Sequence, residues 1–507
     1  MTKPYYITTP LYYVNSKPHI GHAYTSVLCD SFARFRRLSG EKVFFLTGTD
    51  EHGTKIDKAA RDAGKEPKQF VDGIVPEFKK LWEALNVQYD FFIRTTDEEH
   101  KKVVREILID LEKKGEIYQD KYKGWYCVPC ESFWTKLQLK EGKCPDCGRE
   151  VTELEEENYF FKLSKYQTWL IDYIKNAPDF IRPDYRKNEI LSFLKEPLED
   201  LCITRPKSRL SWGIPYPNSD QHVVYVWFDA LVNYYAAGKF PEVAKRFGNV
   251  WPADLHMIGK DILRQHAVYW PIMLKAMGAE MPKKIIAHGW WTMEGAKMSK
   301  SRGNVVNPHE MVNKFTADGV RYYLLREVTL GQDGTYSEEL MTERFNTDLA
   351  NDLGNLVMRS TAMLERYFGG ILAESRFDEN DQKLIAEACA AFKSSMFGYD
   401  PRAALAAIWE IIRRANRYVD DRKPWVLAKE GNQQELAKVL CVLMESIRSV
   451  AILLQPFLPA SSKKILKCFG IEKELMLDES LRWGTLKPGL KIQTCGILFP
   501  KIEVEKK

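Results

Sequence analysis

Two pairs of cysteines have the spacing that most directly predicts a chemical site in this sequence. Each pair has the form Cys-x2-Cys, and thirteen residues, 131–143, separate them; the members are Cys127, Cys130, Cys144 and Cys147. Four thiolates in turns with proline or glycine suit a tetrahedral Zn²⁺ ion. Such an ion has no open coordination position, so we expect a structural role. Unliganded or oxidised thiols are the alternative, but two such pairs rarely coincide by chance.

A segment with two histidines and a glycine lies near the N-terminus, between residues 10 and 22. It follows a predicted strand and runs into a predicted helix. Gly21 would let a ligand approach the backbone, and a helix N-terminus offers free N–H groups to an anion. His19 and His22 are three residues apart, so both imidazoles face one side of the helix. The segment predicts a polyphosphate site, although a simple helix cap explains it equally well on this segment alone.

A basic loop is predicted between Gly295 and Asn304. It contains Lys297, Lys300 and Arg302, together with two serine hydroxyls. A loop of this composition can close over phosphates and open to release them. A solvated basic loop would be the better interpretation if the segment stood alone.

Alternating strands and helices must position these residues. Apolar runs predict strands at Tyr5–Thr8 and Val43–Thr47, and between them apolar positions from Ala23 to Leu38 predict a helix that Gly40 ends. A strand, a crossover helix and another strand form the βαβ unit of a parallel, doubly wound sheet. Further strands are predicted at Val223–Trp227, Leu255–Ile258 and Ile285–His288.

The pattern changes twice along the chain. An acidic, proline-containing stretch with the four cysteines interrupts the α/β pattern, and beyond residue 346 the i, i+3, i+4 spacing of amphipathic helices dominates, as in 405–419 and 436–450. We therefore predict an α/β fold with a Rossmann-like, doubly wound parallel sheet and an inserted zinc-binding module, followed by an all-α helical bundle. The expected segments are 1–115 and 221–290 for the two halves of the α/β domain, 116–220 for the insertion, 291–345 for the basic loop and the region after it, and 346–507 for the bundle.

Composition excludes several classes of protein. The 507 residues suggest about three domains. With 45% hydrophobic residues and a net charge of 74 − 69 = +5, the chain is neither disordered nor polybasic. Ten cysteines are too few for a disulfide scaffold. The N-terminus lacks the regions of a signal peptide, and the longest apolar stretch, around 450–454, is too short to span a bilayer. We expect a cytoplasmic protein without membrane association.

Two short motifs, taken together, resemble a known signature. His19-Ile-Gly-His22 and Lys297-Met-Ser-Lys-Ser301 match the signature pair of the class I aminoacyl-tRNA synthetases in the right order. Five further segments narrow the resemblance: Thr47-Gly-Thr-Asp-Glu-His-Gly-Thr54, Val224-Tyr-Val-Trp-Phe-Asp-Ala230, Gly259-Lys-Asp-Ile262, His288-Gly-Trp-Trp291 and Lys423-Pro-Trp-Val426. By these residues the chain is identified as a member of the bacterial-type methionyl-tRNA synthetase family, over nearly its whole length.

The resemblance implies a ligase, methionine–tRNA ligase, that acts in translation. Methionine would be activated by ATP to methionyl-adenylate with release of pyrophosphate, and the methionyl group would pass to the 3′-terminal ribose of tRNA(Met), for elongation and for initiation. His19, His22, Lys297 and Lys300 would be the catalytic residues, because phosphoryl chemistry rests on positioning and charge stabilisation. Mg²⁺ is expected with the ATP. The implied ATP-binding residues are His19, Gly21, His22, Gly259, Asp261, Lys297 and Lys300.

A pocket for methionine should combine aromatic side chains that contact the thioether with one carboxylate for the ammonium group. By the resemblance, Asp50 takes the ammonium. The remaining implied pocket residues are Leu11, Tyr13, Trp227, Ala230, Tyr234, His266 and Trp270. Taken singly, each aromatic residue is better explained by core packing than by ligand binding. Only the presence of the motifs favours ligand binding.

The resemblance also assigns the last two segments. It makes 291–345 a region that contacts the tRNA stem and 346–507 the anticodon-binding domain. Trp425 would stack on an unstacked anticodon base, with Asn355 and Arg359 reading base edges. Arg413, Arg414, Arg417, Arg422 and Lys423 could follow phosphates, but an ordinary charged helix face is about as well supported. Because the chain stops soon after the helical region, we expect a monomer, with a separate tRNA-binding subunit acting in trans as a further possibility.

Three rival interpretations remain. Other class I synthetases need a longer chain or a zinc ion in the amino-acid pocket. A small nucleotidyltransferase would not need a helical domain with Trp425. A zinc-containing RNA-binding module that has lost catalysis is the rival from a different class, but His19, His22, Asp50, Lys297 and Lys300 are all present.

Overall fold

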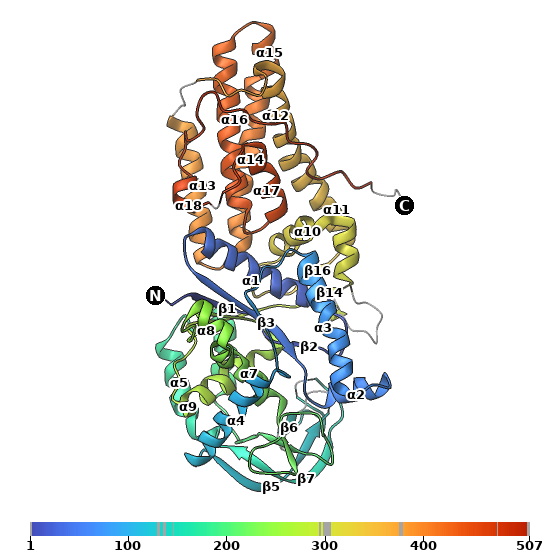
Figure 1. Ribbon diagram of the computed structural model, residues 1–507. Helices are drawn as coiled ribbons and strands as arrows, with labels where there is room; N and C mark the ends of the chain where they lie inside the picture. Colours follow the sequence, from blue (N-terminus) through green and yellow to red (C-terminus); the bar gives the residue numbers. More distant parts are fainter. Residues whose placement is uncertain are drawn as a thin grey trace. The chain divides into compact units, whose positions relative to one another are not determined.

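The computed structural model of the protein describes residues 3–128, 132–134, 138–145, 147–293, 296–297, 306–374, 379–473 and 475–503 (Figure 1). Two predicted site residues, Cys130 and Lys300, lie outside these ranges. The chain forms two compact units. The first consists of Met1–Pro18, Phe44–Lys80 and Tyr89–His288, and the second of His19–Val43, Leu81–Gln88 and Gly289–Lys507. Within the described ranges, none of the helices combines the length and the apolar character that a bilayer crossing requires.

A seven-stranded sheet forms the centre of the first unit, with the order β2-β3-β1-β12-β13-β8 and with β4 added beside β3. The strands are β1 (Tyr5–Thr8), β2 (Tyr12–Tyr13), β3 (Val43–Asp50), β4 (Phe91–Arg94), β8 (Ile181–Arg182), β12 (Leu255–Gly259) and β13 (Ile285–His288). The registers of β1 with β12, β12 with β13 and β3 with β4 are parallel. Every residue of β3, β12 and β13 is buried, as expected for a parallel sheet covered on both faces.

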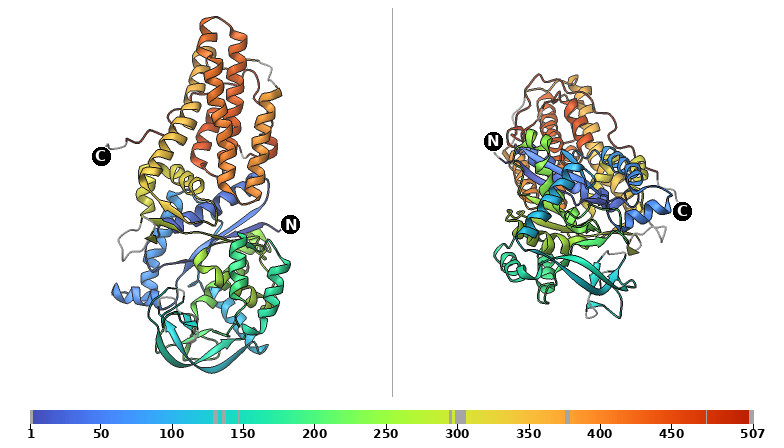
Figure 2. Two further views of the ribbon diagram at one scale, coloured as in Figure 1. Left: turned by 180° about the vertical axis from the view of Figure 1, so that it is seen from behind. Right: turned by 60° about the horizontal axis from the view of Figure 1, so that its bottom comes forward.

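The first unit also contains a set of α-helices, several of which gather on one side of β1 and β3 in Figure 1 (see also Figure 2). They are α2 (Thr54–Asp62), α3 (Pro67–Ala84), α4 (Glu98–Lys113), α5 (Gln167–Asn176), α6 (Asp184–Phe193), α7 (Val226–Ala236), α8 (Pro241–Phe247) and α9 (Trp270–Met277). A π-helix, η5 (Gln265–Tyr269), leads directly into α9. The predicted Rossmann-like, doubly wound fold is therefore confirmed.

One strand prediction, Val223–Trp227, is wrong in its second half. β11 (His222–Val224) pairs antiparallel with β10 (Thr204–Pro206) outside the main sheet, and helix α7 begins at Val226. The run of β-branched and aromatic residues misled the prediction because α7 is buried on nearly all sides. A short apolar run in a buried helix cannot be distinguished from a buried strand by periodicity.

The insertion contains a separate antiparallel sheet with the order β6-β5-β7-β9. Its members are β5 (Ile117–Cys127), β6 (Ser132–Trp134), β7 (Thr152–Phe161) and β9 (Leu201–Cys202). The long β5–β7 ladder, with Ile117 opposite Phe161 and Tyr126 opposite Thr152, comes to the front in the right view of Figure 2. Cys127, at the end of β5, lies in a small apolar cluster with Trp134 and Cys144.

Helices dominate the second unit, which confirms the predicted all-α bundle. They are α1 (Ile20–Leu38), α10 (Pro308–Glu327), α11 (Glu338–Arg344), η7 (Phe345–Gly354), α12 (Asn355–Phe368), α13 (Glu379–Phe397), α14 (Pro401–Arg422), α15 (Pro424–Lys429), α16 (Gln433–Leu454), α17 (Pro459–Cys468) and α18 (Leu477–Ser480). Helices α12, α13, α14 and α16 run side by side in the bundle (Figures 1 and 2). A small sheet of β14 (Trp291–Met293), β15 (Ala296–Lys297) and β16 (Gly334–Tyr336) completes the unit.

A buried ion pair anchors α1, the helix whose N-terminus carries the two predicted histidines. Arg321 Nη2 of α10 lies 2.7 Å from Asp30 Oδ2 of α1, and both side chains are fully buried. The guanidinium also donates to the carbonyl oxygens of Pro456 and Phe457. Because a buried charge is tolerated only when it is paired and hydrogen-bonded, this contact holds α1 in one place within the second unit.

Candidate active site

The first group of predicted pocket residues meets where β2 and β3 end. Tyr13 of β2 lies opposite Asp50, the last residue of β3, in a parallel register. The Tyr13 hydroxyl donates to the carbonyl oxygen of His52 over 2.9 Å. Asp50 is buried, and Leu11 packs half-buried against the core of the unit. The structure therefore brings Tyr13, Asp50 and the segment after Asp50 together at the carboxyl end of the sheet, the edge where open α/β sheets bind ligands.

The second group forms a cluster of aromatic and histidine rings on α7, η5 and α9. The Tyr234 hydroxyl lies 2.7 Å from His266 Nε2, and His266 Nδ1 lies 2.9 Å from the carbonyl oxygen of Ile262. The Trp227 ring is 6.4 Å from the His266 ring, and the Trp270 ring is 6.0 Å from the Tyr234 ring. Four of the predicted pocket residues are thus brought together.

The hydrogen bonds of His266 define its protonation. Since a carbonyl oxygen can only accept, Nδ1 carries the proton, and Nε2 then accepts from the Tyr234 hydroxyl. Burial lowers the pKa of His266 to about 4. The ring is consequently neutral at physiological pH, and it is a rigid, uncharged member of the cluster.

Behind this cluster lies His256 of β12, which the motif analysis did not single out. Trp270 Nε1 donates to His256 Nε2 over 3.3 Å, so the proton is on Nδ1, which lies 2.8 Å from the Thr8 hydroxyl. Burial and, second, the neighbouring His266 hold the pKa of His256 well below its usual range. His256 thus supports Trp270 from the core. From the sequence, only its position inside a predicted buried strand indicated that His256 is a core residue.

A buried carboxylate, Asp229, connects the two groups, and the prediction missed it as well. Asp229 Oδ2 lies 2.6 Å from His52 Nδ1, and Oδ1 lies 2.6 Å from His100 Nε2. All three side chains are nearly inaccessible to solvent. Burial alone would raise the pKa of Asp229, but His52 and His100 outweigh it and lower the pKa. Asp229 lies between Trp227 and Ala230 on the first turn of α7, so the contact ties this turn to the segment after Asp50.

The predicted ATP-binding residues of the first unit follow β12. Gly259 is the last residue of that strand, and Asp261 lies two residues later in a short 3₁₀ turn, exposed to solvent. Asp261 precedes η5, and His266 is the second residue of η5. The residues expected near the nucleoside therefore follow another strand of the same sheet, which β1 separates from β3.

The phosphate-site residues of the second unit form the N-terminus of α1. His19 caps the helix: its Nδ1 accepts from the Gly21 N–H over 3.1 Å, and the His19 N–H donates to His22 Nδ1 over 3.1 Å. The two rings stack with centroids 3.8 Å apart. Burial and, second, His19 lower the pKa of His22 well below its usual value. In the neutral ring of His22, whose Nδ1 accepts, the proton is on Nε2.

The cap bonds use Nδ1 of each ring, so the helix cap does not by itself exclude a phosphate site at this helix N-terminus. A Cβ at Gly21 would lie 2.9 Å from His19 Cε1, so a larger residue at this position would displace the capping ring. Of the basic loop, the backbone of Lys297 is described as part of β15, which pairs antiparallel with β14. Lys300 lies outside the described residues.

Three of the four predicted zinc ligands are described, and they come together. The Sγ atoms of Cys127, Cys144 and Cys147 all lie within 4.8 Å of one another, and those of Cys127 and Cys147 are 3.5 Å apart. The Cys144–Gly148 turn is closed by the Gly148 N–H, which donates to the Cys144 carbonyl oxygen over 2.9 Å. Thiolates on such a turn and on the end of β5 could hold a metal ion that has sulfur ligands.

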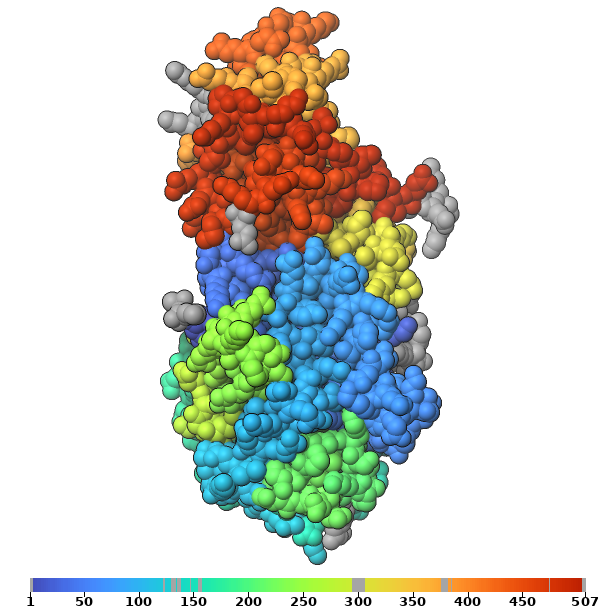
Figure 3. Space-filling view, in the orientation of Figure 1, coloured from blue at the N-terminus to red at the C-terminus, as the bar shows by residue number. Residues whose placement is uncertain are grey.

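The predicted anticodon residues lie on adjoining helices of the second unit. Asn355 and Arg359 are on α12, and Arg359 Nη2 is 4.0 Å from Asp420 on α14. α15 follows α14 directly and carries Trp425, whose side chain is 42% exposed. Figure 3 shows the region around α15, in orange, at one end of the helical unit. An exposed tryptophan on a rigid helix end is suited to stacking on a base.

Comparison with family models matches both parts of the chain. A model described as class I tRNA synthetases (M) matches residues 5–155 and 149–361. A model described as the anticodon-binding domain of methionyl tRNA ligase matches residues 372–507. The matches therefore cover the sheet, the insertion and the bundle.

Comparison with individual proteins agrees with the family models. The methionine–tRNA ligase of Caldanaerobacter subterraneus subsp. tengcongensis is 49% identical over 100% of this chain and 80% of that protein. The methionine–tRNA ligase of Thermotoga maritima is 46% identical over 99% of this chain and 81% of that protein. Among solved structures, Mycobacterium tuberculosis methionyl-tRNA synthetase in complex with methionyl-adenylate superposes with a TM-score of 0.93 at 42% identity, covering 98% of this chain and 100% of that one.

Proposed function

Because the chain belongs to the methionyl-tRNA synthetase family of class I aminoacyl-tRNA ligases, we propose that it joins methionine to tRNA(Met) in two steps. In the first, the methionine carboxylate attacks the α-phosphate of ATP, and pyrophosphate leaves. In the second, the 3′-terminal ribose hydroxyl of the tRNA takes the methionyl group, and AMP leaves. Elongator and initiator tRNA(Met) are both substrates in this proposal.

The observation that carries the proposal is the interlocked cluster of Tyr234, His266, Trp227 and Trp270 in the first unit. Hydrogen bonds hold the Tyr234, His266 and Trp270 rings, and burial keeps His266 uncharged. Such a wall suits an unbranched, polarisable thioether and offers no charge to a competing polar side chain. Asp50 would bind the ammonium group, with Leu11, Tyr13 and Ala230 completing the pocket.

Catalysis of the first step would rest on charge stabilisation. His19 and His22 would donate to phosphate oxygens, and the positive end of the α1 dipole would add to the attraction. Lys297 and Lys300 would neutralise the departing pyrophosphate, and Gly259 and Asp261 would contact the ribose and adenine. One such donor is typically worth about 3–4 kcal/mol at the transition state. Mg²⁺ would arrive with ATP, coordinated by phosphates and water.

The thiol cluster would hold one structural zinc ion. Cys127, Cys144 and Cys147 supply three sulfur ligands of the right chemistry, and Cys130 would be the fourth. The ion would crosslink the end of β5 to the Cys144–Gly148 turn, in the segment 116–220 that we propose as the inserted module. Within the second unit, 291–345 would contact the tRNA stem, and 346–507 would bind the anticodon through Trp425, Asn355 and Arg359.

The test is ATP–pyrophosphate exchange without tRNA, measured on zinc-loaded protein with each of the twenty amino acids in turn. Exchange driven by methionine alone is the expected result, followed by charging of both tRNA(Met) species. Exchange with another amino acid would refute the pocket assignment but keep the reaction. Absence of exchange in a folded, zinc-loaded protein would instead favour an RNA-binding module without catalysis.

A further inference from the structure

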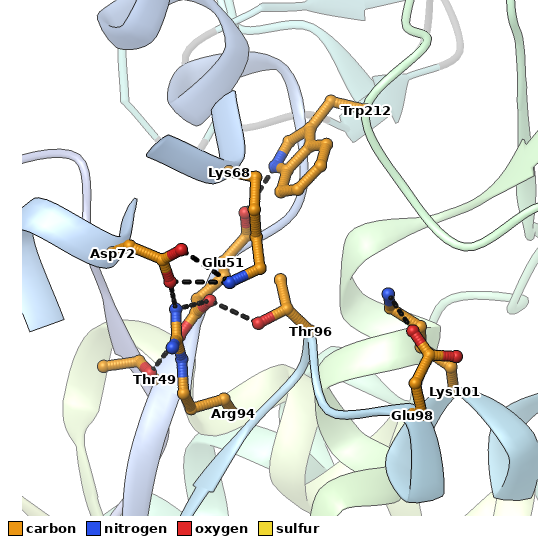
Figure 4. Close-up of polar contacts among 9 residues, drawn as sticks. All are labelled: Thr49, Glu51, Lys68, Asp72, Arg94, Thr96, Glu98, Lys101 and Trp212. Carbon is orange, nitrogen blue, oxygen red and sulfur yellow. Dashed lines mark hydrogen bonds and ion pairs between the residues drawn. The ribbon is translucent and has the colours of Figure 1, made fainter. Parts of the chain in front are cut away.

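Glu51, the residue after Asp50, is a fully buried carboxylate with an unusually complete set of partners (Figure 4). Arg94 donates to it twice, from Nε over 2.6 Å and from Nη2 over 2.8 Å. The hydroxyls of Thr49 and Thr96 donate over 2.6 and 2.7 Å. Burying a carboxylate is costly unless it is paired and hydrogen-bonded, so this set of donors makes the burial possible.

The backbone of Glu51 is held as firmly as its side chain. Its N–H donates to the Thr95 hydroxyl over 2.9 Å, and its carbonyl oxygen accepts from Trp212 Nε1 over 2.6 Å. The peptide planes on both sides of Glu51 are therefore fixed. Because the plane between Asp50 and Glu51 determines ψ of Asp50, these contacts help to set the direction in which the Asp50 side chain leaves the backbone.

Arg94 is itself anchored from the other side. Its Nη2 donates to Asp72 of α3 over 2.5 Å, and Asp72 accepts from Lys68 over 2.6 Å. Burial alone would lower the pKa of Arg94, but the hydrogen bonds and charge of Glu51, with those of Asp72, outweigh it and raise the pKa. The guanidinium thus stays charged between two carboxylates.

The strands that carry these groups approach each other closely. Thr49 of β3 lies opposite Arg94 of β4 in register, and a Cβ on Gly48 would lie 2.0 Å from the Ile93 carbonyl oxygen. Only glycine permits this spacing at position 48, so Arg94 reaches Glu51 with little freedom. The contact is built into the sheet, unlike the exposed Glu98–Lys101 pair that lies apart from it in Figure 4.

We propose that Glu51, held by Arg94, Thr95 and Thr96, is a positioning residue that orients the Asp50 carboxylate toward the ammonium group of methionine. This inference rests on the proposed function, in which Asp50 binds that ammonium group. A buried ion pair with a purely structural role would lower stability when disrupted, but it would not change which part of the ligand is recognised. The two roles therefore differ in a measurable property.

The experiment compares two inhibitors of methionine-dependent ATP–pyrophosphate exchange, using the full-length, zinc-loaded enzyme. Methioninol keeps the ammonium group but lacks the carboxylate, and 4-(methylthio)butanoate keeps the carboxylate but lacks the ammonium group. The main variant is Thr95→Val, which has nearly the same shape but cannot accept from the Glu51 N–H. Thr95→Ser keeps the hydroxyl and serves as the rescue, and Glu98→Gln in the exposed pair is the control. Glu51→Gln is included if it folds.

We expect Thr95→Val to raise the inhibition constant of methioninol by about three- to tenfold, the effect of one hydrogen bond, while that of 4-(methylthio)butanoate stays unchanged. Thr95→Ser and Glu98→Gln should match the wild type for both inhibitors. Equal weakening of both inhibitors, or no change, in Thr95→Val would overturn the inference.

Asp50→Asn separates this inference from the proposed function. If Asp50→Asn weakens only methioninol while Thr95→Val does not, the pocket assignment stands and the positioning role of Glu51 is wrong. If Asp50→Asn affects both inhibitors equally, the ammonium assignment fails, and the inference fails with it.

Discussion

Replacement of the buried Asp229 by asparagine is the most demanding test of the way the pocket is assembled. Asp229 accepts from His52 and His100 over 2.6 Å each, and its side chain is 1% exposed. Hydrogen bonds to a charged group contribute about 1.5–3 kcal/mol each. Asparagine keeps one accepting oxygen but presents an NH2 group to the other imidazole. The variant therefore loses at least one charge-assisted bond and weakens the second, and we expect a loss of about 2–4 kcal/mol.

Thermal unfolding followed by calorimetry measures this loss. For a unit of this size, each kcal/mol corresponds to about 2–4 °C in Tm, so the transition of the first unit should shift down by about 4–16 °C. The exposed Asp220, changed to asparagine, is the matched control in the same unit. Because α7 also carries Trp227 and Ala230, the KM for methionine in the exchange assay should rise in Asp229→Asn and stay constant in Asp220→Asn.

The pH dependence has a definite sign. The pKa of Asp229 is lowered in the folded protein, because its two histidine partners outweigh the effect of burial. A carboxyl group with a depressed pKa stabilises the fold above its unfolded pKa of about 4 and loses that contribution as the pH falls through the folded pKa. The Tm difference between wild type and Asp229→Asn should thus be constant from neutral pH to about 5 and narrow below about 4. A variant that melts within about 1 °C of the wild type at neutral pH would refute the assigned hydrogen bonds.

Three further predictions concern the other parts of the proposed function. Lys300→Ala should slow ATP–pyrophosphate exchange by about 10²–10³ without changing the KM for methionine, and an unaltered single-turnover rate would contradict a role in the first step. Trp425→Ala should reduce tRNA charging by about tenfold or more at unchanged exchange, whereas Trp425→Phe should retain most activity; equal loss in both assays would refute the stacking role of Trp425. Metal analysis should find about one zinc per chain and much less in Cys144→Ser; a metal-free wild type that stays folded and active would contradict the zinc site.

The fold was largely predictable because its strands and helices carry strong local patterns. β1, β3, β12 and β13 are short, largely buried runs rich in apolar residues, and α14 and α16 follow the helical period over more than five turns. The prediction failed at the start of α7, where a buried helix and a buried strand have the same composition. At the start of α7, local composition predicts that the segment is buried, but the packing around it determines whether the backbone is a helix or a strand.

The site was predictable only to the extent that motifs are contiguous in sequence. His19, Gly21 and His22 form a local cap whose geometry follows from three-residue spacing, and the cysteines come in two short Cys-x2-Cys pairs. Asp229 and His100 are 129 residues apart, and Arg94 and Glu51 are 43 apart. No periodicity connects such partners, because the sheet order and the crossover helices decide which loops meet. The supporting groups of the pocket therefore became visible only with the fold.

The distribution of charge explains why these supporting groups are buried acids and neutral histidines. Where the proposed pocket would attract an ammonium group, the carboxylates Glu51 and Asp229 have fixed partners and cannot turn toward the ligand in place of Asp50. Along the aromatic wall, burial lowers the pKa of His266 to about 4 and that of His256 well below its usual range. Neither ring is then positively charged at physiological pH. A positive charge there would repel the ammonium group and stabilise a competing acidic side chain. In the proposed pocket, Asp50 would then accept the ammonium group, while the neutral rings would contact the thioether.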